Sequence, residues 1–196
     1  MLKLYPNERM SQTMTLYYRL CEQNFNLKPI KRCVMLSPKI EKALNAQINA
    51  ELFSSYLYLA MVAYFQDTNL SGFAHWMTLQ SQEETSHGMK FFQHIIERGG
   101  RVTLEVIDRP QFEWKSPLEA MEAALEHEIY ITKRINDLVD LAMDEKDHAT
   151  ASFLQWFVDE QVEEEDNANG IVQKLRMIGD HPGGLFMLDR DMGSRA

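Results

Sequence analysis

Four long stretches of this 196-residue sequence repeat apolar residues at spacings of three and four, and this period limits the fold more than any other feature. Leu44, Ile48 and Leu52 show the pattern in the first stretch. Only 9 Gly and 6 Pro are present, and good helix formers fill the stretches between them. The sequence therefore predicts an all-α fold. The expected long helices span residues 38–67, 73–98, 117–144 and 149–178.

The connections between these helices predict their topology. Residues 67–72 form a short polar turn, so the first two helices should pair as an antiparallel hairpin. Residues 101–115 have no helical stripe and are long enough to run back along a bundle. Ser37-Pro38 and the capping box Ser116-Pro117-Leu118-Glu119 mark two helix starts. We expect a four-helix bundle with one long crossover and a short fifth helix over residues 185–192.

Charge and cysteine content divide the chain into two parts. Residues 1–34 carry six Lys/Arg against two Asp/Glu, whereas residues 35–196 carry fourteen against twenty-seven. An acidic domain is poorly suited to nucleic acid and well suited to cations. Both cysteines, Cys21 and Cys33, precede residue 35, so the predicted domain at 35–196 has no thiol ligands, and we expect a cytoplasmic protein. No apolar run reaches membrane-spanning length, and we expect neither a membrane nor a nucleic-acid partner.

Acidic residues on the apolar faces of all four helices are the candidates for chemistry, because such residues are costly to bury unless they are paired or bind metal. Glu51 and Tyr58 lie two helical turns apart on one face. Glu84-Thr85-Ser86-His87 places a carboxylate beside an imidazole. The third helix offers Glu126-His127-Glu128 and the fourth offers Glu160-Gln161-Val162-Glu163-Glu164. This oxygen-rich set of ligands favours iron or manganese.

The motifs Glu51-x6-Tyr58, Glu84-x2-His87, Glu128 and Gln161-x2-Glu164 resemble the ferroxidase centre of bacterial non-haem ferritins in order and separation. The resemblance covers residues 35–196 and implies a ferritin-like bundle with two irons per chain. One iron would be held by Glu51, Glu84 and His87, with Glu84 as the bridge to a second iron on Glu128 and Glu164. Tyr58 and Gln161 would lie close by. A third iron would use Glu83, Glu160 and Glu163.

The resemblance also implies an activity and an assembly. Two Fe(II) ions would each give one electron to O2 or H2O2, and the Fe(III) product would be stored as mineral inside a cage of twenty-four identical subunits. Bacterioferritins place a haem-binding methionine where this sequence has Thr85, so no haem is expected. Helix 149–178 also lacks the second Glu-x-x-His unit of bacterioferritins and rubrerythrins.

Two other functions remain as alternatives, and several residues have simpler interpretations. The chain could be a small di-iron peroxidase of the rubrerythrin kind that retains no iron, or a cage whose metal site is silent and whose role is assembly or DNA protection. Trp156 is expected to pack in the core. Surface or packing roles are expected for the remaining histidines, which are His75, His94, His127, His148 and His181.

Residues 1–34 have two interpretations. Met35-Leu36-Ser37-Pro38 resembles a normal ferritin beginning, which favours an upstream start codon with Met35 as the true first residue. The alternative is a basic targeting or partner-binding arm, since low acidity and scattered arginines resemble those of transit peptides.

Overall fold

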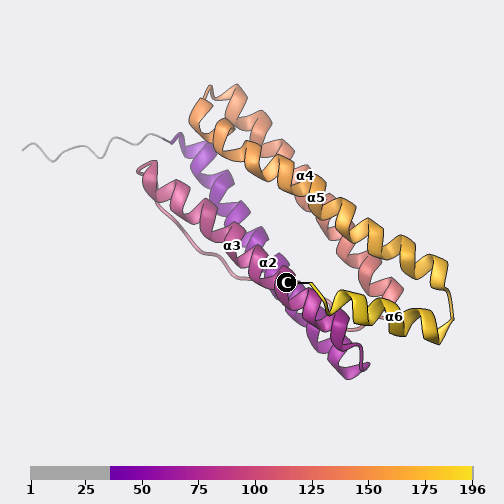
Figure 1. The fold of residues 1–196 in the computed structure, drawn as a ribbon. Helices are drawn as coiled ribbons and strands as arrows, with labels where there is room; N and C mark the ends of the chain where they lie inside the picture. The colour runs from indigo at the N-terminus through magenta and orange to yellow at the C-terminus, as the bar shows by residue number, and fades with distance from the viewer. Residues whose placement is uncertain (1–35, 196) are drawn as a thin grey trace, which may run out of the picture. The chain divides into compact units, whose positions relative to one another are not determined.

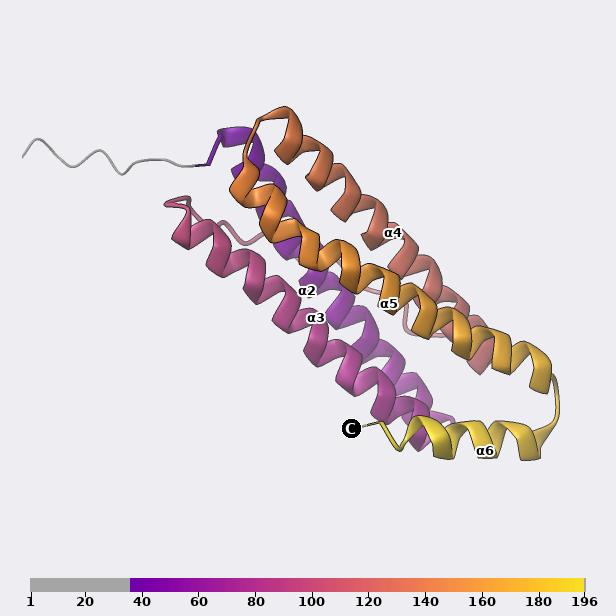
Figure 2. The same cartoon turned by 45° about the horizontal axis from the view of Figure 1, so that its top comes forward.

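The structure, a computed structural model, describes residues 36–195, and within that range all regular structure is helical. Figures 1 and 2 show four long helices lying side by side as a bundle and a short helix crossing one end of it. These views confirm the predicted all-α bundle with a short fifth helix. The two expectations for residues 1–34 lie outside the described residues. The helices are α2 (Pro38–Asp67), α3 (Ser71–Glu97), α4 (Pro117–Asp144), α5 (His148–Ile178) and α6 (Pro182–Met192).

Side-chain caps set the starts of α2 and α4, as the sequence predicted. Ser37 caps α2 by accepting a hydrogen bond from the Ile40 amide, and Ser116 caps α4 by accepting one from the Glu119 amide. Each cap residue is followed by a first-turn proline, whose fixed φ suits a helix start.

Helix α5 begins one residue earlier than predicted, whereas α6 and α3 begin two or three residues earlier, each for a physical reason. Helix α6 begins at Pro182 because the His181 Nδ1 accepts a hydrogen bond from the Gly184 amide at 3.1 Å and so caps a glycine-rich first turn. Helix α3 begins at Ser71 without a local side-chain cap. The amides of its first turn at Gly72 and Phe73 donate to the carboxylate of Asp189 in α6, at 2.9 and 3.0 Å.

The crossover from α3 to α4 runs back along the bundle without regular secondary structure over residues 101–114 (Figure 1). The Asn45 side chain in α2 anchors its start. Its amide nitrogen donates to the Arg101 carbonyl at 3.0 Å, and its carbonyl accepts from the Thr103 amide at 2.7 Å. The predicted long crossover is therefore present, and its first residues are fixed to α2.

The apolar core is divided into two clusters along the bundle. One cluster includes Met61 and Phe73, and the other includes Ile48 and Phe91, which stacks on Phe157. In every long helix, polar residues occupy the inward positions between the two clusters. The bundle therefore has a polar layer near its middle, with apolar layers on both sides.

Candidate metal centre

Four glutamates form the acidic part of the polar layer, one from each long helix. Their side chains are buried, with residue exposures of 1% for Glu51, 1% for Glu84, 2% for Glu128 and 4% for Glu164. A buried carboxylate is costly unless it is protonated, hydrogen-bonded or paired with a cation. Four of them at one level of an apolar bundle therefore need either protons or bound cations.

Glu51, Glu84 and His87 lie together in one corner of the layer. One potential ligand atom from each of the three lies within 4.8 Å of the others. Glu84 Oε2 lies 3.7 Å from His87 Nδ1, which reflects their spacing of three on α3. That same oxygen is buried and has no hydrogen-bond partner. An unpartnered carboxylate oxygen beside an imidazole nitrogen fits a bound cation.

Glu128 and Glu164 lie on the α4 and α5 side of the layer, and neighbouring side chains orient both. Tyr58 donates its hydroxyl proton to Glu128 Oε1, and the Gln161 amide nitrogen donates to Glu128 Oε2 at 3.2 Å. The Gln80 amide nitrogen donates to Glu164 Oε2 at 2.7 Å. The structure thus places all seven predicted site residues in one layer, while their roles toward a metal stay a prediction.

Burial sets the ionisation of this layer. It raises the pKa of Glu128 to about 8, with a further contribution from the negative charge of Glu164, whose own pKa burial raises to about 7. Burial and the nearby Glu51 carboxylate raise the pKa of Glu84 well above its ordinary range. Burial lowers the pKa of His87 to about 4, so its imidazole is neutral at neutral pH. A neutral imidazole has the free nitrogen lone pair that a metal ligand needs.

The three residues predicted for a third iron lie on the face between α3 and α5, where the layer approaches solvent. Glu160 Oε1 lies 3.6 Å from His87 Nε2, and its pKa is raised by burial and by the charges of Glu163 and Glu83. Glu163 is exposed. Glu83 pairs with Arg195, a contact that the sequence did not predict.

Sequence reasoning also missed two glutamines that hold the buried carboxylates. Gln47 donates to Glu51 Oε1 at 2.9 Å, and its own carbonyl accepts from Arg134 Nε at 2.9 Å. In the same way, the Gln80 amide nitrogen donates to Glu164 Oε2. A signal was present for both, because Gln47 and Gln80 each precede a site glutamate, Glu51 or Glu84, by four residues and so share its helix face.

Two of the residues expected to have packing or surface roles, His127 and Trp156, lie beside the layer. His127 contacts Ser54 Oγ through Nε2 at 2.8 Å and meets the Tyr58 ring edge-on. Trp156 is 40% exposed and meets the His87 ring edge-on at 5.4 Å between centroids. His94 contacts the Thr150 hydroxyl at 3.1 Å. The contacts of His94 and His127 agree with packing roles. The core position expected for Trp156 is wrong, because its ring lies at the exposed edge of the layer, between His87 and the Lys90 ammonium.

The helices of residues 36–195 include none that is both long enough and apolar enough to cross a membrane.

Comparison with known proteins gives one consistent family. The model of the ferritin-like domain matches residues 41–178. A bacterial non-haem ferritin of Bacteroides fragilis is 48% identical over 161 residues, which cover 82% of this chain and 100% of that protein. A bacterial non-haem ferritin of Campylobacter jejuni is 39% identical over 80% of this chain and 93% of that one. The crystal structure of an open pore ferritin from Archaeoglobus fulgidus has a TM-score of 0.82 and 52% identity, covering 83% of this chain and 99% of that one.

The pKa shifts predict how the stability of the metal-free protein depends on pH. Glu128 and Glu164 keep their protons in the folded state up to pKa values of about 8 and about 7, against an ordinary value of 4.5. Above pH 7 the folded state therefore binds more protons than the unfolded state, and the free energy of unfolding should fall between pH 7 and 9. His87 and His127, whose pKa values are lowered to about 4, are neutral in both states over most of this window.

Denaturant unfolding of metal-free protein across this pH range measures the slope. A Glu128→Gln/Glu164→Gln double variant should make the slope smaller, with Glu84 supplying what remains, whereas the control Glu126→Gln/Asp166→Asn, at exposed positions of the same helices, should keep the slope unchanged. A free energy of unfolding that rises with pH in the unmodified protein would contradict the protonated layer.

Proposed function

The chain belongs to the ferritin family, and on that premise we propose that it oxidises Fe(II) to Fe(III) at the polar layer and stores the product as a ferric mineral inside an oligomeric cage. The observation that carries the proposal is the unpartnered, buried oxygen of Glu84 between Glu51 and His87. A carboxylate in that setting is stabilised by a cation, and within residues 36–195 no lysine or arginine forms an ion pair with Glu84.

The charge of the layer favours two ferrous ions. When ionised, the four buried glutamates carry four negative charges, and two Fe(II) ions carry four positive charges, while His87 is neutral. We assign Glu51, Glu84 and His87 to one iron and Glu128 and Glu164 to the other, with Glu84 as the bridge. Such a layer is nearly neutral both with protons alone and with two ferrous ions, so either state can be accommodated inside the bundle.

The residues of the layer suit one-electron oxidation of each iron. Two Fe(II) lose one electron each, and O2 takes up both electrons with two protons to give H2O2; with H2O2 as oxidant, two electrons and two protons give two waters. Hard anionic oxygens favour Fe(III) over Fe(II). Tyr58 and Gln161 hold Glu128 from opposite oxygens, which fixes the orientation of that ligand.

We propose that the product leaves the layer toward solvent between α3 and α5. Glu160 lies beside His87 at the partly exposed face between α3 and α5, and Glu163 lies further out. We propose that Glu83, Glu160 and Glu163 form a third iron position on this route. Increasing exposure along it lowers the cost of moving a charged ion outward.

Exposed apolar side chains support the proposed assembly. On the crossover, Val106 is 85% exposed and Leu104 is 66% exposed, and Tyr56 and Leu59 on α2 are each 50% exposed. Exposed apolar side chains of this size are suited to burial against another copy of the chain. The similar protein from Archaeoglobus fulgidus is described as an open pore ferritin. We therefore propose a cage of identical subunits, with twenty-four as the number that the bacterial non-haem ferritins imply.

Removal of the bridging charge should slow iron oxidation. The Glu84→Gln variant should lower the initial rate of Fe(II) oxidation by at least about 10- to 100-fold, the loss typical for changes even in groups that only support metal ligands. The rate is measured by the absorbance of Fe(III) after anaerobic Fe(II) loading and addition of O2. Glu97→Gln, at an exposed position of the same helix, is the matched control and should keep the rate. An undiminished initial rate in Glu84→Gln would favour the silent scaffold over the ferroxidase.

Particle size together with iron retention separates storage from peroxidase turnover. After loading with many Fe(II) per chain and O2, the protein should sediment as one large particle that carries its iron with it. Iron content per chain in the sedimenting fraction is the measurement. Sedimentation of the 22.8 kDa chain as a monomer or dimer, or turnover that leaves no retained iron, would contradict storage and support the rubrerythrin-like alternative.

A further inference from the structure

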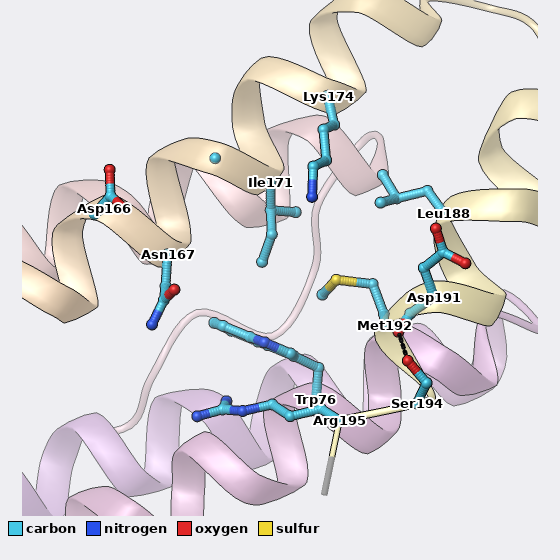
Figure 3. Close-up of a pocket in the computed structure, with 11 residues that line it drawn as sticks. Trp76, Asp166, Asn167, Ile171, Lys174, Leu188, Asp191, Met192, Ser194 and Arg195 are labelled. Atoms are coloured by element: carbon cyan, nitrogen blue, oxygen red, sulfur yellow. Dashed lines mark hydrogen bonds between the residues drawn. The ribbon is translucent and has the colours of Figure 1, made fainter.

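The turn after α6 brings a cationic side chain back to the edge of the polar layer. A cavity of about 540 Å³ lies between α3, α5 and the end of α6, and Trp76, Lys174 and Met192 are among the residues that line it. In Figure 3, the Arg195 side chain extends along α3 beneath the Trp76 indole. The Arg195 guanidinium carbon lies 5.1 Å from the centre of that ring, a favourable cation–π distance.

Arg195 is held by two site residues on α3. Its Nη2 lies 2.9 and 3.1 Å from the two carboxylate oxygens of Glu83, and its Nη1 donates to the Gln80 carbonyl oxygen. The side chain of Arg195 is 27% exposed and that of Glu83 is 42% exposed, so water reaches the pair only in part. Both oxygens of Glu83 are therefore already committed to a cation.

Through Gln80 the same guanidinium reaches the paired centre. The Gln80 amide nitrogen donates to Glu164 Oε2 at 2.7 Å, while the Gln80 carbonyl accepts from Arg195. Arg195 thus contacts the third-iron candidate Glu83 directly and the ligand candidate Glu164 through one amide. A metal ion that binds Glu83 must compete with the guanidinium for the same two oxygens.

We propose that Arg195 gates the third iron position: its guanidinium occupies the cation site of Glu83 in the metal-free protein, and a metal ion binds there by displacing it. The inference rests on the proposed use of Glu83, Glu160 and Glu163 as a third iron position. Arg195 is then a specificity-determining residue, because a cation must bind these carboxylates more strongly than a tethered guanidinium does. Displacement also releases Gln80, so filling the outer position loosens the support of Glu164.

Trp76 supplies a direct readout of that displacement. Tb(III) binds carboxylates and emits when a nearby indole is excited, and an ion in the place of the guanidinium would lie close to Trp76. The assembled, metal-free protein is titrated with Tb(III), and the Trp76-dependent emission is the part that a Trp76→Phe change removes. This subtraction excludes emission sensitised by Trp156, which lies beside His87.

The variant Arg195→Met keeps an unbranched stem and removes the charge. Its Trp76-dependent emission should reach half-saturation at a Tb(III) concentration about fivefold lower than in the unmodified protein, the upper range for a partly exposed ion pair. Arg195→Lys keeps the charge but loses the planar pair of donors, so its half-saturation should lie in between. Arg190→Met is the matched control, since Arg190 is exposed and its one ion pair within the described part of the chain is with its neighbour Asp191. Its half-saturation should equal that of the unmodified protein.

Equal half-saturation in the unmodified protein, Arg195→Met and Arg195→Lys would overturn the gate. If Arg195→Met fails to assemble, the comparison of Arg195→Lys with the unmodified protein decides in the same way. Calorimetric binding of Zn(II), which stands in for Fe(II), separates this failure from that of the proposed function. If two strong Zn(II) sites per chain are found and changes at Arg195 have no effect, only the proposed gate is wrong. If those two sites are absent, the proposed paired centre itself is wrong.

Discussion

Burial of four carboxylates at one level of a helical bundle is the constraint on which the rest of this structure depends. Glu51, Glu84, Glu128 and Glu164 come from four different helices, and apolar clusters lie on both sides of them. Their mutual repulsion and burial hold protons on the layer when no metal is bound. The helices must therefore keep a fixed register, since a shift along one axis would move a carboxylate into an apolar cluster. The caps at Ser37 and Ser116, and the attachment of the crossover to Asn45, help to fix that register.

The same constraint connects structure to chemistry. Four buried glutamates can be neutralised by protons or, under the proposed function, by two ferrous ions, so iron and protons would exchange for one another within a bundle that need not rearrange. Glutamine amides at Gln47 and Gln80 orient two of the carboxylates, and Arg134 and Arg195 hold those amides from the rim. Positive charge therefore lies near the layer without pairing with Glu84, which under the proposed function would leave the central carboxylate oxygens to the metal. The partly exposed glutamates between α3 and α5 provide the transition from this buried layer to water.

Much of this arrangement could be predicted from the sequence, because the governing patterns are local. Each of these patterns lies within a single helix: the helical period, the cap residues, and the spacing of Glu84 and His87. Together they predicted the bundle, the crossover and the candidate ligands. What could not be predicted involves residues far apart in the chain. Asp189 caps α3 across 117 residues, and Arg195 reaches Glu83 across 112. Such contacts depend on where the last turn returns to the bundle, which no periodic pattern records. The direction in which the Gln47 and Gln80 amides point is likewise set by partners on other helices.

The central claim is that two irons bind within one chain and share Glu84. Anomalous diffraction at the iron edge, from crystals loaded with Fe(II) without oxygen, tests it most directly. Two anomalous peaks per chain are expected inside the bundle, one beside Glu51 and His87 and one beside Glu128 and Glu164, with Glu84 contacting both. A single peak, or peaks confined to exposed carboxylates on the surface, would contradict the paired centre.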